Sequence, residues 1–134
     1  MANQQPAIID ACILIDFAID GRLDSMRRLP FLLLLPDLVQ LEVTRPGQKR
    51  MLDELIEEKV FTVISTSADE IEEIRDLNRE ERGLSPADCS VVVLARSRRA
   101  IALSNDSRVQ RRCGRLGIAC YGTAWIDAQL TTMP

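Results

Sequence analysis

The sequence predicts an α/β fold in which a parallel sheet carries helices on both faces, and three observations support this. Short apolar runs alternate along the chain with longer segments whose apolar residues recur at helical spacing. Proline or glycine marks several of the boundaries, as at Pro36 and Gly83. Five of the short runs have strand character, and strands that alternate with helices pair in parallel. We therefore expect a three-layer α/β/α sandwich with a central, mainly parallel five-stranded sheet.

The first half of the chain contains three of the predicted strands. Residues 7–9 form a short apolar run, and residues 31–35 form another that lies between two prolines. Residues 60–64 are rich in β-branched and aromatic side chains, which favour a strand. The predicted helices of this half are residues 11–18, 37–44 and 48–58.

The second half begins with a charged helix over residues 67–82, which has an apolar stripe and ends before a glycine. Ser85 then offers an N-cap, with proline at the first helical position and an acid at the third, so a helix is expected from there to about residue 98. The remaining predicted elements are strands 101–103 and 118–121 and helices 107–116 and 124–130.

The 134 residues suit one domain, which we expect to span residues 1–134. The apolar share of 46% and the charged share of 28% exclude disordered, collagen-like and coiled-coil classes. No apolar run is long enough to cross a membrane, and we expect no secretory signal at the N-terminus. The four cysteines form no C-x-x-C pair, which favours a reduced, cytoplasmic protein.

Histidine is absent, which excludes Ser-His-Asp catalysis and histidine-ligated zinc. The net charge of -3 argues at first against a nucleic-acid partner. Residues 53–82 alone contribute -7, however, so the rest of the chain carries +4. We expect most of this acidic segment to be solvated helix surface. The overall charge therefore does not exclude RNA.

Two aspartates lie just after predicted strands. Asp10 comes after the first strand, and Asp106 follows the fourth strand through Ser104 and Asn105. Ligands of open parallel sheets bind beyond the carboxyl ends of the strands, so both are candidate site residues. Helix N-capping is the alternative role for each.

Asp88 and Glu42 share the apolar faces of their predicted helices. Asp88 lies three, four and seven residues before Val91, Val92 and Ala95, and Glu42 lies in phase with the apolar residues of its own short helix. A carboxylate that points inward is unfavourable unless it is paired or bound to a metal. Asp88 also fits a capping box, which is its structural alternative.

Four acids that converge without histidine would form an all-oxygen site. Mg²⁺ and Mn²⁺ prefer such ligands and leave coordination positions open for phosphate oxygens. In phosphodiester hydrolysis, such ions activate water and stabilise the leaving oxygen, so no side-chain base is needed.

These segments resemble the PIN domain, a Mg²⁺/Mn²⁺-dependent ribonuclease fold, and especially the small bacterial PIN proteins typified by VapC toxins. The resemblance rests on Glu42 and on residues 9–16, 84–88, 103–106 and 116–118. It implies that the metal ligands and catalytic acids are Asp10, Glu42, Asp88 and Asp106. It also implies that Ser104 is a hydroxyl that positions water or Asp106. Cys12 stands where the family often has asparagine or serine, which removes polar support near Asp10.

The resemblance further implies a cytoplasmic endoribonuclease that acts on RNA, forms a homodimer and serves as the toxin of a type II toxin–antitoxin pair, with an antitoxin as its partner. The alternative is a non-catalytic PIN-like module that binds RNA or protein and keeps its acids as helix caps. A receiver-like signalling domain is disfavoured, because no suitable lysine follows a late strand.

Arginines form a single stripe on the predicted helix 107–116. They are spaced at i, i+3, i+4 and i+7, and they are Arg108, Arg111, Arg112 and Arg115. The stripe is either a solvated face or a surface that binds RNA backbone or an acidic partner segment.

Overall fold

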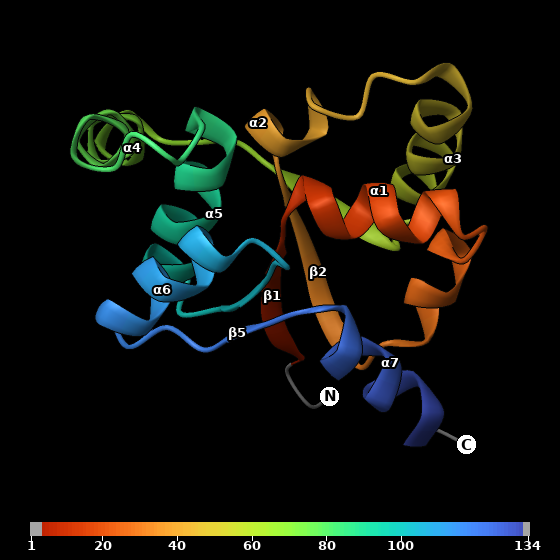
Figure 1. Cartoon of the computed structure of the whole chain (residues 1–134). Helices are drawn as coiled ribbons and strands as arrows, with labels where there is room; N and C mark the ends of the chain where they lie inside the picture. The colour runs from red at the N-terminus through yellow and green to blue at the C-terminus, as the bar shows by residue number, and fades with distance from the viewer. Residues whose placement is uncertain (1–3, 133–134) are drawn as a thin grey trace.

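A five-stranded, fully parallel sheet forms the centre of the computed structural model, which describes residues 4–132 (Figure 1). The strands are β1 (Gln5–Ile9), β2 (Phe31–Pro36), β3 (Phe61–Ile64), β4 (Ile101–Leu103) and β5 (Cys120–Tyr121). They pair in the order β3-β2-β1-β4-β5. The predicted fold class is confirmed.

The order of the strands reverses direction at β1. From β1 the chain builds β2 and β3 on one side, and it then returns to build β4 and β5 on the other. Ile9 pairs with Leu103 at the carboxyl ends of β1 and β4, and the backbone N–H of Asp10 donates to the carbonyl of Leu103 at 3.0 Å. This is the topological switch point, where open α/β sheets bind their ligands.

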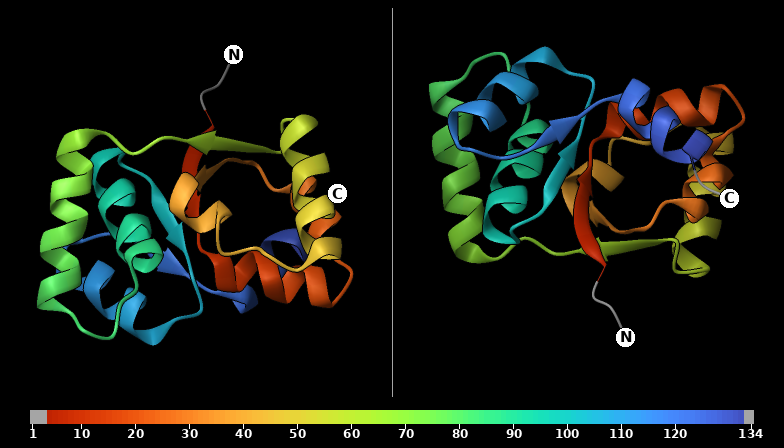
Figure 2. Two further views of the ribbon diagram at one scale, coloured as in Figure 1. Left: turned by 90° about the horizontal axis from the view of Figure 1, so that it is seen from above. Right: turned by 90° about the horizontal axis from the view of Figure 1, so that it is seen from below.

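Helices cover both faces of the sheet (Figure 2). They are α1 (Ala11–Ile19), α2 (Asp37–Gln40), α3 (Pro46–Glu57), α4 (Ala68–Glu80), α5 (Pro86–Ser97), α6 (Ser107–Arg115) and α7 (Thr123–Thr132). In both views of Figure 2, α4, α5 and α6 lie on one side and α1, α3 and α7 on the other. None of the helices in the described range is long and apolar enough to cross a bilayer.

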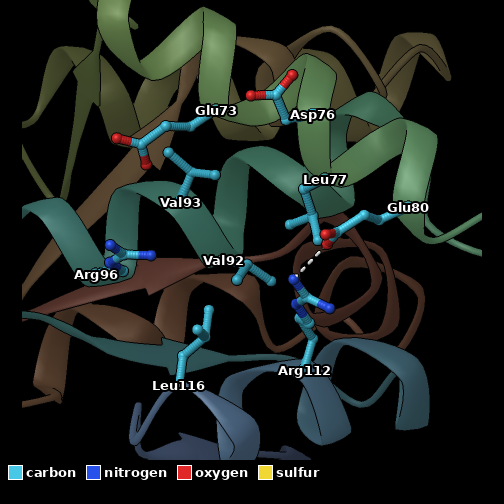
Figure 3. A pocket seen from close by; sticks show the side chains of 9 residues that line it. All are labelled: Glu73, Asp76, Leu77, Glu80, Val92, Val93, Arg96, Arg112 and Leu116. Carbon is cyan, nitrogen blue, oxygen red and sulfur yellow. Dashed lines mark hydrogen bonds and ion pairs between the residues drawn. The ribbon is translucent and has the colours of Figure 1, made fainter.

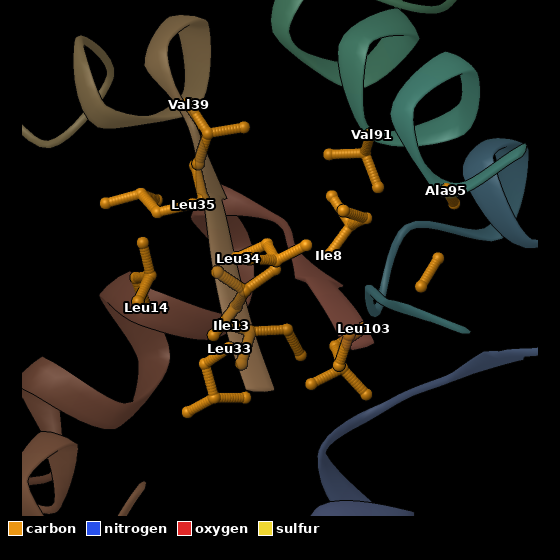
Figure 4. Packing of buried hydrophobic residues seen from close by; sticks show 14 of the residues in the cluster. Ile8, Ile13, Leu14, Leu33, Leu34, Leu35, Val39, Val91, Ala95 and Leu103 are labelled. Carbon is orange, nitrogen blue, oxygen red and sulfur yellow. The ribbon is translucent and has the colours of Figure 1, made fainter. Parts of the chain in front are cut away.

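The core lies on both sides of β1 and β2, as expected for a parallel sheet with two covered faces. Figure 4 shows Val91 and Ala95 of α5 pointing toward Ile8, with Leu14 of α1 and Leu35 on the other side of the strands. All five are at most 1% exposed. Burial of α5 against the sheet holds the start of that helix, where Asp88 lies, beside the carboxyl ends of the strands.

Some elements differ from the predictions. The second helix was expected over 37–44 but ends at Gln40, and Glu42 lies in an exposed turn. The last strand is shorter than predicted. A 3-10 helix over Leu23–Arg28 was not predicted, although buried Leu23 and Met26 anchor it. The expected absence of a secretory signal rests partly on residues 1–3, which lie outside the described residues.

Candidate metal centre

Asp10 is a buried carboxylate at the switch point. It is 2% exposed and follows β1 directly. Its Oδ1 accepts the backbone N–H of Ala11 at 2.8 Å, so Asp10 caps α1. Its Oδ2 accepts the hydroxyl of Ser104 at 2.6 Å. The carboxylate is therefore held rigidly between two elements.

Burial raises the pKa of Asp10, and the negative charge of Asp88 raises it further, against the lowering effect of the hydrogen bonds from Ser104 and Ala11. Among the described residues, no arginine or lysine forms an ion pair with Asp10, Asp88 or Asp106. No basic side chain in the described range therefore neutralises the negative charge at this edge.

Ser104 connects two of the candidate acids. Its side chain is fully buried, and its hydroxyl donates to Asp10 while accepting the backbone N–H of Asp106 at 3.1 Å. Asp106 in turn caps α6, because its Oδ1 accepts the backbone N–H groups of Arg108 at 2.8 Å and Val109 at 3.4 Å. Ser104 therefore fixes the loop that carries Asp106 relative to Asp10.

Asp88 lies at the third position of α5 in a capping box. Its Oδ2 accepts the backbone N–H of Ser85 at 3.0 Å, and the Ser85 hydroxyl accepts the N–H of Asp88 at 3.1 Å. Asp88 is half-buried, and its charge acts on Asp10. The structural alternative proposed for Asp88 is therefore present, and the residue also lies at the same edge as Asp10.

Glu42 does not point inward. The expectation of an inward carboxylate assumed a helix that continues to residue 44, but α2 ends two residues before Glu42, and the side chain is exposed. In residues 4–132, no group of three acidic or cysteine side chains is arranged to hold one metal ion. Asp10, Asp88 and Asp106 nevertheless lie at one edge of the sheet, and Glu42 lies outside it.

Cys12 makes polar contacts near Asp10, although its replacement of the family's asparagine or serine predicted that such contacts would be lost. Its thiol donates to Oδ2 of Asp10 at 3.5 Å, lies 3.7 Å from the Ser104 hydroxyl, and accepts the backbone N–H of Asn105 at 3.4 Å. Burial, together with the charge of Asp10, raises the pKa of Cys12 to about 11. The thiol is therefore protonated at neutral pH and acts as a donor.

Asn105 ties the edge to the last helix, and the sequence analysis did not single it out. Its Nδ2 donates to Asp16 at 3.2 Å and to the Thr123 hydroxyl at 2.6 Å, while its Oδ1 accepts the backbone N–H of Thr123 at 2.8 Å. Gly122 leaves the room for this side chain, since a Cβ there would lie 2.5 Å from the Asn105 oxygen. The one feature of the sequence that could have pointed to Asn105 is its place directly before Asp106.

The four arginines of α6 differ in their contacts: two form ion pairs with acids at the end of α4, and two contact backbone carbonyls. Arg112 is largely buried and forms ion pairs with Glu80 at 2.6 Å and with Glu81 at 3.3 Å. Figure 3 shows the pair with Glu80, and both of its residues line a hollow of about 310 Å³ between α4, α5 and α6. Arg115 lies 3.4 Å from Glu81. Arg108 donates to the carbonyl of Gly83, and Arg111 contacts the backbone of its own helix.

Comparison with known proteins agrees with the fold. The PIN-domain family DUF3368 matches residues 6–132. No curated protein matches the chain. The crystal structure of PAE2754 from Pyrobaculum aerophilum is similar with a TM-score of 0.64 and 15% identity, covering 96% of this chain and 91% of that one. A toxin–antitoxin complex from Klebsiella pneumoniae is similar with a TM-score of 0.59 and 18% identity, covering 78% and 89%. Since the family match extends over nearly the whole chain, the protein belongs to the PIN-domain family.

Proposed function

We propose that this protein is an endoribonuclease that depends on Mg²⁺ or Mn²⁺. One observation carries the proposal: the buried carboxylate of Asp10 lies at the switch point of the sheet, near Asp88 and Asp106, and no basic side chain within residues 4–132 forms an ion pair with it. A cation is the partner that such a group lacks. PIN domains are generally nucleases, and membership of this family supports the proposed nuclease activity.

The donor types suit a hard divalent ion. No three of the candidate side chains in residues 4–132 are arranged around one point, so binding requires the carboxylates to converge. Oδ1 of Asp88 and Oδ2 of Asp106 accept no hydrogen bond from the described residues, so one oxygen of each remains available. All the candidate ligands are carboxylates, as Mg²⁺ and Mn²⁺ prefer. In this proposal Asp10, Asp88 and Asp106 bind the metal. Glu42, which is exposed in the turn after α2, joins them as the fourth ligand only through a movement of that turn. When bound, the ion supplies Lewis acidity that activates a water and stabilises the leaving oxygen.

The remaining residues of the edge position these ligands. Ser104 holds Oδ2 of Asp10 and the backbone of Asp106, and the protonated thiol of Cys12 donates to the same Asp10 oxygen. Each contact fixes a ligand before metal or substrate arrives, so less ordering is required on binding. Ser104 and Cys12 are thus proposed as positioning residues.

The proposed substrate and partners are supported by membership of the PIN-domain family, not by distances within the site. We propose RNA as the substrate, a homodimer as the assembly and the cytoplasm as the location. The Klebsiella pneumoniae structure is a toxin–antitoxin complex, and its likeness in fold supports an antitoxin as a partner of this chain.

Cleavage of a labelled RNA by the purified protein tests the proposal. We expect cleavage with Mn²⁺ and none with EDTA. Asp10→Asn and Asp88→Asn should each reduce the rate by roughly a hundredfold or more, because the bound ion contributes several kcal/mol of charge stabilisation. Asp69→Asn is the matched control, since Asp69 is an exposed acid in the first turn of α4. Cleavage by Asp10→Asn at the rate of the parent would overturn the mechanism.

A second candidate is a non-catalytic module that binds RNA or protein. The observation in its favour is that Asp10 and Asp106 each cap a helix, and that Asp88 completes the capping box of α5. Under this alternative, millimolar Mn²⁺ leaves the unfolding temperature unchanged. If the protein has a metal site, Mn²⁺ binds the folded state and raises the unfolding temperature by mass action. Thermal unfolding with and without Mn²⁺ separates the two.

A further inference from the structure

We propose that Arg108, Arg111 and Arg115 form a subsite for a backbone phosphate of RNA beside the carboxylate edge. These three arginines line a pocket of about 160 Å³ with Gly83 and Glu81. The volume is roughly that of five waters, enough for one phosphate group and part of its hydration shell. The inference rests on the proposed function for the identity of the anion as RNA.

The charges around the pocket favour an anion. Of the four arginines on α6, Arg112 is neutralised by Glu80 and Glu81 and does not line the pocket. Glu81 is the one acid in the lining, and it is paired with Arg112 and Arg115. Arg108 and Arg111 form no ion pair with any described acid. Their guanidinium groups retain donors for a phosphate, which arginine binds in bidentate fashion.

Gly83 gives the pocket its shape. Arg108 lies across the turn between α4 and α5, and its Nη1 donates to the Gly83 carbonyl at 3.1 Å. A Cβ on Gly83 would lie 2.7 Å from Cδ and 2.9 Å from Nε of Arg108. The φ of Gly83 is not positive, so alanine is compatible with the backbone there. Alanine at this position would therefore move a flexible arginine side chain at little expense to the fold.

Two short stretches of chain connect the pocket to the carboxylate edge. The turn that contains Gly83 leads into α5 and Asp88, and Arg108 follows Asp106 by two residues. Along α6, Arg111 and Arg115 extend the positive surface by about 10 Å from Arg108, at 1.5 Å per residue. A phosphate near the one being cleaved is therefore the ligand that the position suits.

RNA binding without metal tests the subsite independently of catalysis. The probe is a short, labelled, single-stranded RNA in EDTA, and the readout is its fluorescence anisotropy. Arg111→Glu should weaken binding by roughly tenfold. Arg111→Ala should reduce the slope of log K against log salt by about 0.7, the value for one lost contact to single-stranded nucleic acid. Gly83→Ala should bind the RNA more weakly than the parent, because alanine displaces the Arg108 side chain. It should bind the RNA more tightly than Arg108→Ala, which lacks that side chain altogether.

Arg50→Glu is the matched control, because Arg50 is an exposed arginine of α3, on the other side of the molecule. Arg112 is unsuitable for this purpose, since a glutamate there would face Glu80 and Glu81 and destabilise the fold. In the cleavage assay, Arg111→Glu should raise KM and leave kcat close to that of the parent, which a merely structural role would not do.

Equal RNA binding by Arg111→Glu and Arg50→Glu would overturn the subsite. A labelled polyglutamate peptide serves as a second probe, because the alternative ligand of these arginines is an acidic partner segment. The subsite would also be overturned if Arg111→Glu lost binding to this peptide but bound RNA like the parent. These failures differ from failure of the proposed function. If Asp10→Asn cleaves like the parent while Arg111→Glu loses RNA, the catalytic proposal fails and the subsite stands.

Discussion

The hydroxyl of Ser104 donates a 2.6 Å hydrogen bond to Oδ2 of Asp10, across the carboxyl ends of two neighbouring strands. Both side chains are buried, and the same hydroxyl accepts the backbone N–H of Asp106. One small side chain thus connects two acids that lie nearly a hundred residues apart in the sequence. Its loss affects the geometry of both.

Ser104→Ala should weaken Mn²⁺ binding and lower the free energy of unfolding by about 1–3 kcal/mol, because it leaves buried polar groups without a partner. It should also raise the pKa of Asp10 further, since the Ser104 hydrogen bond lowers that pKa. Ser90→Ala is the control: Ser90 is equally buried, but its hydroxyl donates only to the carbonyl of Ala87. Titration with Mn²⁺ checks the prediction, and equal affinities for the two variants would contradict it.

Cys12→Ser should preserve Mn²⁺ affinity, whereas Cys12→Ala should reduce it by severalfold. Serine keeps a donor toward Asp10, while alanine removes the contacts with Asp10, Ser104 and Asn105. Isothermal titration calorimetry of the two variants measures the difference. If alanine binds Mn²⁺ as well as serine does, the thiol has no positioning role.

Glu70→Gln should destabilise the protein by about 1–2 kcal/mol at pH 7. Glu70 is 7% exposed, and it accepts hydrogen bonds from Ser97 and from the backbone of Ser67. Burial alone raises its pKa, but these hydrogen bonds and the charge of Arg98 outweigh that effect and lower the pKa below its usual value.

The sign of the pH dependence follows from that lowered pKa. The stability contributed by Glu70 is present above the unfolded-state pKa of about 4.3, and it is lost as the pH falls through the folded-state pKa. Urea denaturation at pH 7 and at pH 3 should therefore show a difference between parent and variant that shrinks at the lower pH. Glu72→Gln, at an exposed position on the same helix, should show no such difference.

The sequence predicted the features that depend on local pattern. Asp10 and Asp106 were identifiable because each follows a buried strand, and parallel strands end at one edge. Glu42 was placed wrongly because its apolar neighbours continued a helical pattern beyond the point where α2 ends. Glu70 belonged to a segment expected to be solvated surface, yet it is buried.

Contacts between distant segments could not be predicted in this way. Asn105 pairs with Thr123 only because β4 and β5 are neighbours, and Arg112 pairs with Glu80 only because α6 packs beside the end of α4. Neither pair has a signal in local spacing. Local spacing therefore could not predict which arginines of α6 form ion pairs within residues 4–132, as Arg112 and Arg115 do, and which do not, as with Arg108 and Arg111.

The proposed metal centre at the carboxyl ends of β1 and β4 is tested most directly by calorimetric titration of the metal-free protein with Mn²⁺. The account predicts binding to the parent and to Asp69→Asn, with binding to Asp10→Asn and Asp88→Asn weakened by roughly tenfold or more. Binding of Mn²⁺ to Asp10→Asn with the affinity of the parent, or no binding to the parent at all, would contradict it.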